Sequence, residues 1–137
     1  MKIVICASMS AAKKVIEVQK ALLAMGNEVV IPKNIDKYAD GTLAPENRQE
    51  STQNKINEDL IRSYYQEIQN SDAVLAVNED KNGITNYIGG NTFLEIGFAY
   101  ALNKKIYLLN DIPEVSYMDE IIAMRPIVIF GLLNKIR

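Results

Sequence analysis

The chain has 137 residues, of which 48% are apolar and 23% charged, and these values are typical of one soluble globular domain spanning residues 1–137. Its 15 basic and 17 acidic residues leave a net charge of −2 without any run of Lys or Arg, which argues against nucleic acid as a partner. No apolar stretch is long enough for a membrane span or a signal peptide, so we expect a cytoplasmic protein without a membrane partner.

Strand-like and helix-like patterns alternate from the beginning of the chain. An apolar run over residues 2–7 is followed by apolar residues at helical spacing, a helix that Ser10 is expected to cap and Gly26 to end. A second apolar run follows over residues 28–32. These three segments predict one β-α-β unit.

The alternation continues through the rest of the chain. The further predicted elements are, in order, a helix over residues 54–69, a strand over 73–77, a helix over 92–102, a strand over 106–109, a short helix between 116 and 125, and a strand over 127–130. Right-handed crossovers between such strands predict a single doubly wound, flavodoxin-like α/β fold, with a parallel five-stranded sheet of order 2-1-3-4-5 flanked by helices. A ligand would bind outside the carboxyl ends of strands 1 and 3.

Polar residues follow both of these strands. Ser8, Met9 and Ser10 come after the first strand, where hydroxyls and free N–H groups at a helix N-terminus could bind a phosphate or a sugar. The alternative is that Ser10 only caps its helix. Asn78 follows the third strand and is a further candidate for substrate binding, unless it belongs to a solvated loop.

A third candidate segment begins with Gly89, Gly90 and Asn91 and leads to Glu95. The glycines allow close approach of a ligand to the backbone, and we expect Glu95 in the first turn of a helix, where the helix dipole favours a carboxylate. Thr92 and Glu95 also have the spacing of a capping box, which would need no ligand. The sequence leaves both interpretations open.

Residues 72–77, the segment from Glu95 to Ile106 and the opening Ile5-Cys6-Ala7-Ser8 resemble the nucleoside 2-deoxyribosyltransferase family, including its deoxynucleoside-monophosphate N-hydrolase relatives. The resemblance implies a small-molecule nucleoside or nucleotide partner and cleavage of an N-glycosidic bond. Glu95 would attack the anomeric carbon, and the sugar would pass to another base or to water. It also implies a homo-oligomer with sites completed across subunits, in which the apolar residues 127–136 could form a contact or close the core.

The sequence departs from the family pattern at Val4, Tyr64 and Gly89, where the family usually has a Tyr, an Asp and a polar residue. Tyr64 is a candidate catalytic hydroxyl, although it also fits the apolar face of its helix. Other candidates are Asn91, Asp80 and Glu67 for assisting the departing base, and Lys13 and Lys14 for attracting a phosphate.

No cofactor or metal is expected, because the chain has no His, no cluster of metal ligands and no dinucleotide-binding glycine motif. Two other functions remain open at this stage. One is a catalytically inactive nucleotide-binding module that acts as a sensor, favoured by the missing acid at position 64. The other is an assembly element without a ligand.

Overall fold

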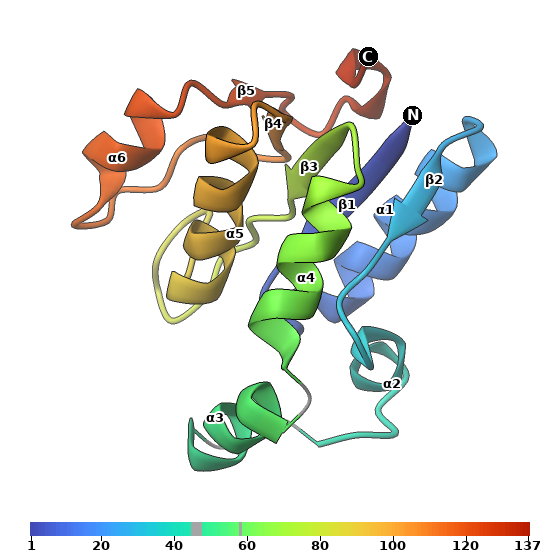
Figure 1. The fold of residues 1–137 in the computed structure, drawn as a ribbon, viewed down its shortest axis with the longest axis vertical. Coiled ribbons are helices and arrows are strands. Elements are labelled where there is room, and N and C mark those ends of the chain that lie inside the picture. Colours follow the sequence, from blue (N-terminus) through green and yellow to red (C-terminus); the bar gives the residue numbers. More distant parts are fainter. Residues whose placement is uncertain (45–47, 58) are drawn as a thin grey trace.

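The computed structural model describes residues 1–44, 48–57 and 59–137. In this part of the chain, five parallel strands form one sheet in the order β2-β1-β3-β4-β5 (Figure 1), which confirms the predicted doubly wound α/β fold. The strands are β1 (Lys2–Cys6), β2 (Glu28–Val30), β3 (Ala73–Ala76), β4 (Lys105–Leu108) and β5 (Ile127–Val128). β4 begins one residue before its predicted apolar run, and the other strands lie within theirs.

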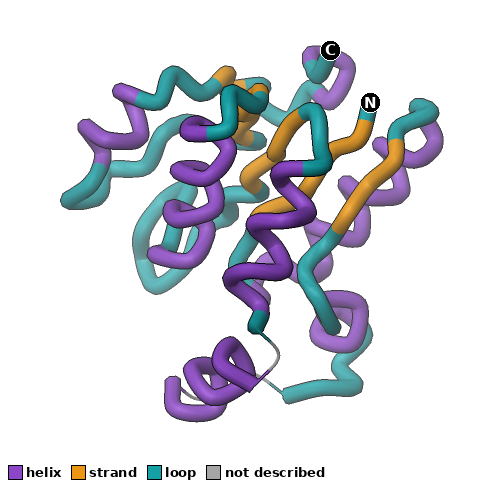
Figure 2. Tube along the Cα trace, in the orientation of Figure 1, coloured by secondary structure: helices purple, strands orange, loops and turns teal. Residues whose placement is uncertain are grey.

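Helices connect the strands and cover the sheet (Figure 2). The α-helices are α1 (Ala12–Ala24), α2 (Ile35–Ala39), α3 (Arg48–Asn57), α4 (Leu60–Gln69), α5 (Gly90–Ala101) and α6 (Met118–Ala123), and the 3₁₀ helices are η1 (Met9–Ala11) and η2 (Leu133–Lys135). Gly26 follows the end of α1 with φ +89°, a left-handed conformation that glycine adopts without strain. This agrees with the prediction that Gly26 ends the helix. None of the described helices has the length and apolar character needed to cross a bilayer.

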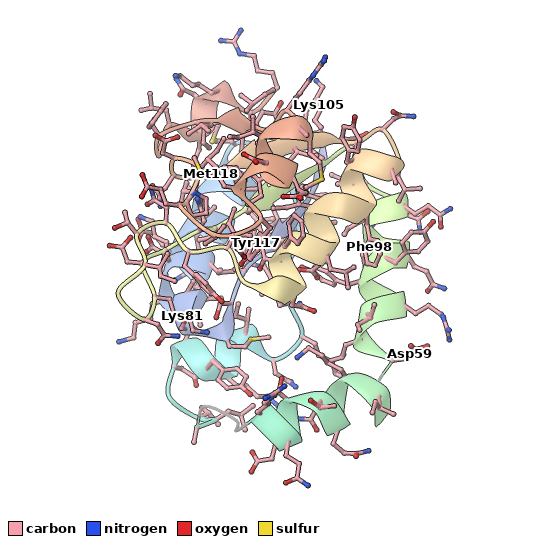
Figure 3. The ribbon with its side chains drawn as sticks, turned by 90° about the vertical axis from the view of Figure 1, so that its left-hand side faces the viewer. Asp59, Lys81, Phe98, Lys105, Tyr117 and Met118 are labelled. Atoms are coloured by element: carbon pink, nitrogen blue, oxygen red, sulfur yellow. The ribbon has the colours of Figure 1, made fainter. Side chains whose placement is uncertain are left out.

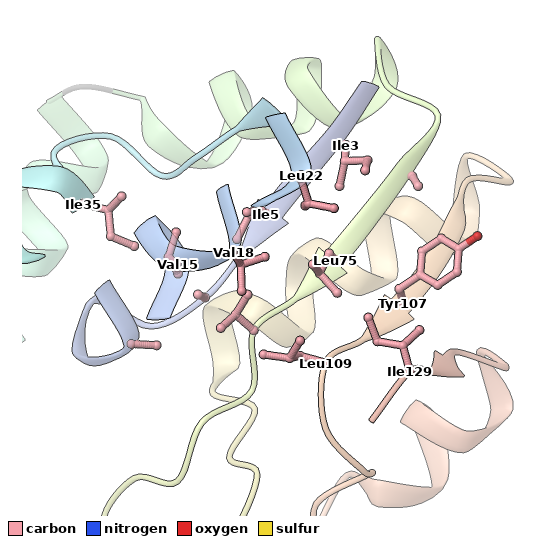
Figure 4. Close-up of a cluster of buried hydrophobic side chains, with 14 of the residues drawn as sticks. Ile3, Ile5, Val15, Val18, Leu22, Ile35, Leu75, Tyr107, Leu109 and Ile129 are labelled. Atoms are coloured by element: carbon pink, nitrogen blue, oxygen red, sulfur yellow. The ribbon is translucent and has the colours of Figure 1, made fainter. Parts of the chain in front are cut away.

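Alternating strand residues point to opposite faces of the sheet and build two apolar layers. On one face, Ile3 and Ile5 pack with Leu22 and other apolar residues of α1, as Figure 4 shows. On the other face, Val4 and Cys6 pack with residues of α4, α5 and α6. This alternation places the Cys6 side chain on the face covered by α5, the helix that carries Glu95.

The predicted single helix over residues 54–69 is wrong, because the structure has two helices there, α3 and α4. Asp59 lies between them with φ 49° and ψ 44°, a left-handed conformation that an α-helix cannot continue through (Figure 3). α3 therefore takes its own direction below the carboxyl end of β1 (Figure 1), while both chain termini lie toward the opposite end of the sheet.

Candidate active site

A cleft of about 800 Å³ lies at the carboxyl end of β1. The loops after β1, β2 and β3 form its walls together with α2, α3, α4 and the beginning of α5. The described residues that line it are Ala7, Ser8, Met9, Ser10, Ala12, Lys13, Pro32, Lys33, Tyr38, Leu43, Arg48, Ser51, Lys55, Leu60, Ser63, Tyr64, Lys81, Tyr87, Gly89, Gly90, Asn91, Thr92 and Glu95.

The loop after β1 brings Ser8, Met9 and Ser10 into the cleft wall, as expected. Ser10 is not the cap, however. The Oγ of Ser8 accepts a 3.4 Å hydrogen bond from the backbone N–H of Ser10 and so caps η1. The two hydroxyl oxygens are 3.0 Å apart. Lys81 from the loop after β3 donates to the Ser8 hydroxyl at 2.9 Å, so the two loops are joined at the cleft.

Gly89, Gly90 and Asn91 line the cleft at the beginning of α5. Because α5 begins at Gly90 with Gly89 as its N-cap, Glu95 is its sixth residue and lies in the second turn, which corrects the expected first-turn position. No side chain caps this helix. The capping-box interpretation of Thr92 and Glu95 is therefore wrong.

Glu95 is only 6% exposed although it lines the cleft. Burial raises the pKa of its carboxyl group from 4.5 to about 8, while the positive charge of Lys55 and a hydrogen bond with the thiol of Cys6 act in the opposite direction. Cys6 is fully buried, and its pKa is raised well above its ordinary value by burial and then by Glu95. The cleft thus holds a carboxyl group that is mostly protonated at neutral pH.

The hydroxyl of Tyr64 donates a hydrogen bond to the backbone carbonyl of Ile5. Burial, followed by the charges of Cys6 and Glu95, raises the pKa of this hydroxyl well above its ordinary value. Its ring lines the cleft and also packs against the apolar layer beneath α4. Tyr64 therefore lies at the cleft and in the apolar layer, and its hydroxyl proton is donated to a backbone oxygen.

Residues 7–122 match the sequence family described as nucleoside 2-deoxyribosyltransferase. The chain belongs to this family. Membership indicates chemistry at the N-glycosidic bond of a nucleoside or nucleotide.

Among solved structures, this deoxyribosyltransferase-family chain is similar to the CMP N-glycosidase BcmB of Clostridium botulinum, with a TM-score of 0.50 and 17% sequence identity. The similarity covers 94% of this chain and 86% of that one, and it shows a shared fold. No curated protein has a significant sequence match to the chain.

Among the predicted substrate-binding residues, Asn78 alone does not line the cleft. Its amide nitrogen donates to the backbone carbonyls of Asn110 and Asp111, each at 3.0 Å, and its amide oxygen accepts from the backbone N–H of Asn110 at 2.9 Å. The side chain thus joins the ends of β3 and β4, which explains an amide at the end of a buried strand without a ligand.

Both carboxylates that are candidates for assisting the departing base, Glu67 and Asp80, also lie outside the cleft lining. Glu67 forms an ion pair with Lys2 at 3.5 Å, next to the amino end of β1. Asp80 accepts a 2.9 Å hydrogen bond from the backbone N–H of Asn86 within its own loop. Among the described residues, Glu95 is therefore the only acidic residue that lines the cleft.

Sequence reasoning missed most of the cations in the cleft. Lys13, a predicted candidate for attracting a phosphate, lines the cleft. Lys14, the other candidate, does not, and it pairs with Glu17 at 3.1 Å. The missed cations are Lys33, Arg48, Lys55 and Lys81. One signal was available, because Arg48, Ser51 and Lys55 have the i, i+3, i+7 spacing of one helix face, and all three line the cleft.

Proposed function

We propose that the protein cleaves the N-glycosidic bond of a nucleoside 5′-monophosphate, with Glu95 attacking the anomeric carbon. The observation that carries this proposal is one buried carboxyl group in a cleft whose other charged groups, among the residues that the structure describes, are cations. A carboxylate can act as the nucleophile in glycosidic bond cleavage, and it needs no His, which this chain lacks. Family membership supports the type of bond that is broken.

The phosphate is inferred from the charge of the cleft. Five cationic side chains line it, Lys13, Lys33, Arg48, Lys55 and Lys81, although the chain as a whole has a net charge of −2. A phosphate would bring negative charge next to these cations, which an uncharged nucleoside would not. A phosphate monoester carries up to two negative charges and accepts strong charge-assisted hydrogen bonds from such groups.

In the reaction, one carboxylate oxygen of Glu95 forms a bond to C1′ of the sugar while the bond from C1′ to the base nitrogen breaks. The electron pair of the broken bond goes to the base, which takes up a proton as it leaves. Water then attacks C1′ and gives up a proton to the solvent, while the bond between C1′ and Glu95 breaks. This releases the sugar phosphate and regenerates the carboxylate. A second base in place of water would give deoxyribosyl transfer instead.

The charge state of Glu95 fits this sequence of steps. With a pKa of about 8, about a tenth of the empty protein carries an ionised Glu95 at pH 7. As the bond to the base breaks, positive charge develops on the sugar, and this charge stabilises the carboxylate more in the transition state than in the ground state. A nearly buried carboxylate is thus best stabilised at the moment of reaction.

The proposal is tested by incubating the purified protein with the deoxynucleosides and deoxynucleoside 5′-monophosphates of the four bases and measuring free base by chromatography. We expect base release from a monophosphate, and loss of release in Glu95→Gln. Glu67→Gln is the matched control, because Glu67 is an acidic residue outside the cleft. Equal activity of the wild type and Glu95→Gln would contradict the role of Glu95.

A second candidate function is a nucleotide-binding module without turnover. It is favoured by Tyr64, whose hydroxyl donates to the carbonyl of Ile5 and so does not replace the acid that the family has at this position. Saturable binding of a nucleotide without release of its base, measured with the same panel of compounds, would support this function over N-glycosidic cleavage.

A further inference from the structure

The ring of Tyr87 lies directly against the backbone of Gly89. A Cβ atom at position 89 would be 3.1 Å from Cε1 of Tyr87 and 3.4 Å from its hydroxyl oxygen. Gly89 has φ −80° and ψ 175°, a conformation that any residue adopts, so its backbone does not require glycine. A side chain at position 89 would instead press on the Tyr87 ring, which would have to move by a few tenths of an ångström to make room.

Several contacts hold this ring in one place. The backbone N–H of Tyr87 donates to the carbonyl of Glu79 at 3.1 Å. Its side chain lies near that of Tyr117, whose hydroxyl pKa is raised by burial and then by Tyr87. Tyr117 is in turn anchored, since it donates to the carbonyl of Ile88 and packs on Phe93 with ring centroids 4.7 Å apart. Figure 3 shows Tyr117 near the beginning of α5. The cleft therefore has a preorganised aromatic wall.

This wall lies close to the reacting group. Gly89 precedes Glu95 by six residues, which corresponds to about 9 Å along a helix axis. The Glu95 side chain leans toward the N-terminus of α5, as helical side chains do, and this shortens the separation. A planar base attached to a sugar at Glu95 would span such a distance.

We propose that Tyr87 is a specificity-determining residue whose ring packs against the leaving base of the substrate. The identity of the ligand rests on the function proposed above, whereas the position of the ring against Gly89 does not. The ammonium group of Lys81, 6.0 Å from the centroid of the Tyr87 ring, adds positive charge on the same side of the cleft. Base and phosphate would therefore be recognised by neighbouring residues.

The test measures binding by calorimetry in a Glu95→Gln background, so that no ligand is consumed. The ligands are the four deoxynucleoside 5′-monophosphates and 2-deoxyribose 5-phosphate, which has no base. Tyr87→Leu is expected to weaken binding of the tightest-binding nucleotide by about tenfold or more, which corresponds to the loss of one base–aromatic stacking interaction. It is expected to leave binding of the sugar phosphate unchanged. Tyr87→Phe keeps the ring and is expected to retain most of the nucleotide affinity.

Gly89→Ala provides an independent test, because its added methyl group would push on the ring, 3.1 Å away, without changing Tyr87 itself. It should weaken nucleotide binding in the protein with Tyr87 and add no further loss in a protein that already carries Tyr87→Leu. The proposal is overturned if Tyr87→Leu leaves nucleotide affinity unchanged or weakens binding of the sugar phosphate equally. It is also overturned if Tyr87→Phe loses as much nucleotide affinity as Tyr87→Leu.

Failure of this proposal is distinguishable from failure of the proposed function. The wild type and Tyr87→Leu could both release base, with the same nucleotide affinity and the same preference among the bases. That result would leave the proposed function intact and remove the role of Tyr87. A protein that binds nucleotides through Tyr87 but releases no base would keep the role of Tyr87 and remove the catalytic function. Binding of none of the four nucleotides would overturn both.

Discussion

The ammonium group of Lys81 donates a 2.9 Å hydrogen bond to the hydroxyl of Ser8, and so joins the loop after β3 to the loop after β1. Lys81→Met should weaken binding of a nucleoside 5′-monophosphate by roughly tenfold, because a hydrogen bond from a charged group contributes about 1.5–3 kcal/mol. Binding of the matching unphosphorylated nucleoside should change little. Titration calorimetry with both ligands checks this prediction.

Lys20→Met is the matched control for Lys81→Met, because Lys20 is an exposed residue of α1 outside the cleft. Its nucleotide affinity should equal that of the wild type. An equal loss of affinity in both variants would show that net charge, and not the position of Lys81, determines binding.

The raised pKa of Glu95 predicts how stability depends on pH. In the unfolded chain this carboxyl group ionises near pH 4.5, whereas in the folded protein it ionises near pH 8. The protonated form therefore favours folding fully below pH 4.5, and this contribution is lost as the pH rises to 8. Relative to Glu95→Gln, the wild type should lose a few kcal/mol of unfolding free energy between pH 5 and pH 9.

Urea denaturation of both proteins at these two pH values measures the difference. Glu67→Gln serves as the control, since Glu67 is partly exposed and paired with Lys2 away from the cleft. A difference between the wild type and Glu95→Gln that does not vary with pH would show that Glu95 ionises as an ordinary surface carboxylate.

The dependence of activity on pH distinguishes two roles of Glu95. A nucleophile must be ionised, so kcat/KM should rise with pH to a plateau above about 8. Lys55 favours the ionised form, and Lys55→Met should therefore move this rise to higher pH, with a larger loss of activity at pH 7 than at pH 9. Activity that falls as the pH rises through 8 would instead identify the protonated Glu95 as the proton donor to the base.

Removal of the Tyr64 hydroxyl tests its structural role. Tyr64→Phe should lower the free energy of unfolding by about 1 kcal/mol, because the carbonyl of Ile5 loses its hydrogen bond from this side chain. Tyr65→Phe is a matched control, since Tyr65 packs edge-to-face on Phe98 through its ring, which the substitution retains. A large loss of activity without a loss of stability would instead favour a catalytic role for Tyr64.

Local pattern was sufficient for the strands and for the order of the sheet, because buried parallel strands are unbroken apolar runs and their crossovers have one hand. It failed at Asp59, where the helical spacing of apolar residues continues across a backbone that adopts a left-handed conformation. It also did not show that Asn78 joins two strands, because a polar residue after a strand has the same local pattern whether it binds a ligand or bonds to a neighbouring strand.

The sequence by itself determined the family, the fold and the position of Glu95 in the helix after the third strand, because apolar periodicity and local motifs are properties of neighbouring residues. Only the tertiary structure decided the charge state of Glu95 and the gathering of Lys13, Lys33, Arg48, Lys55 and Lys81 around one cleft. Burial and Coulomb interaction depend on distance through space, and these residues come from separate segments that meet only after the sheet has formed.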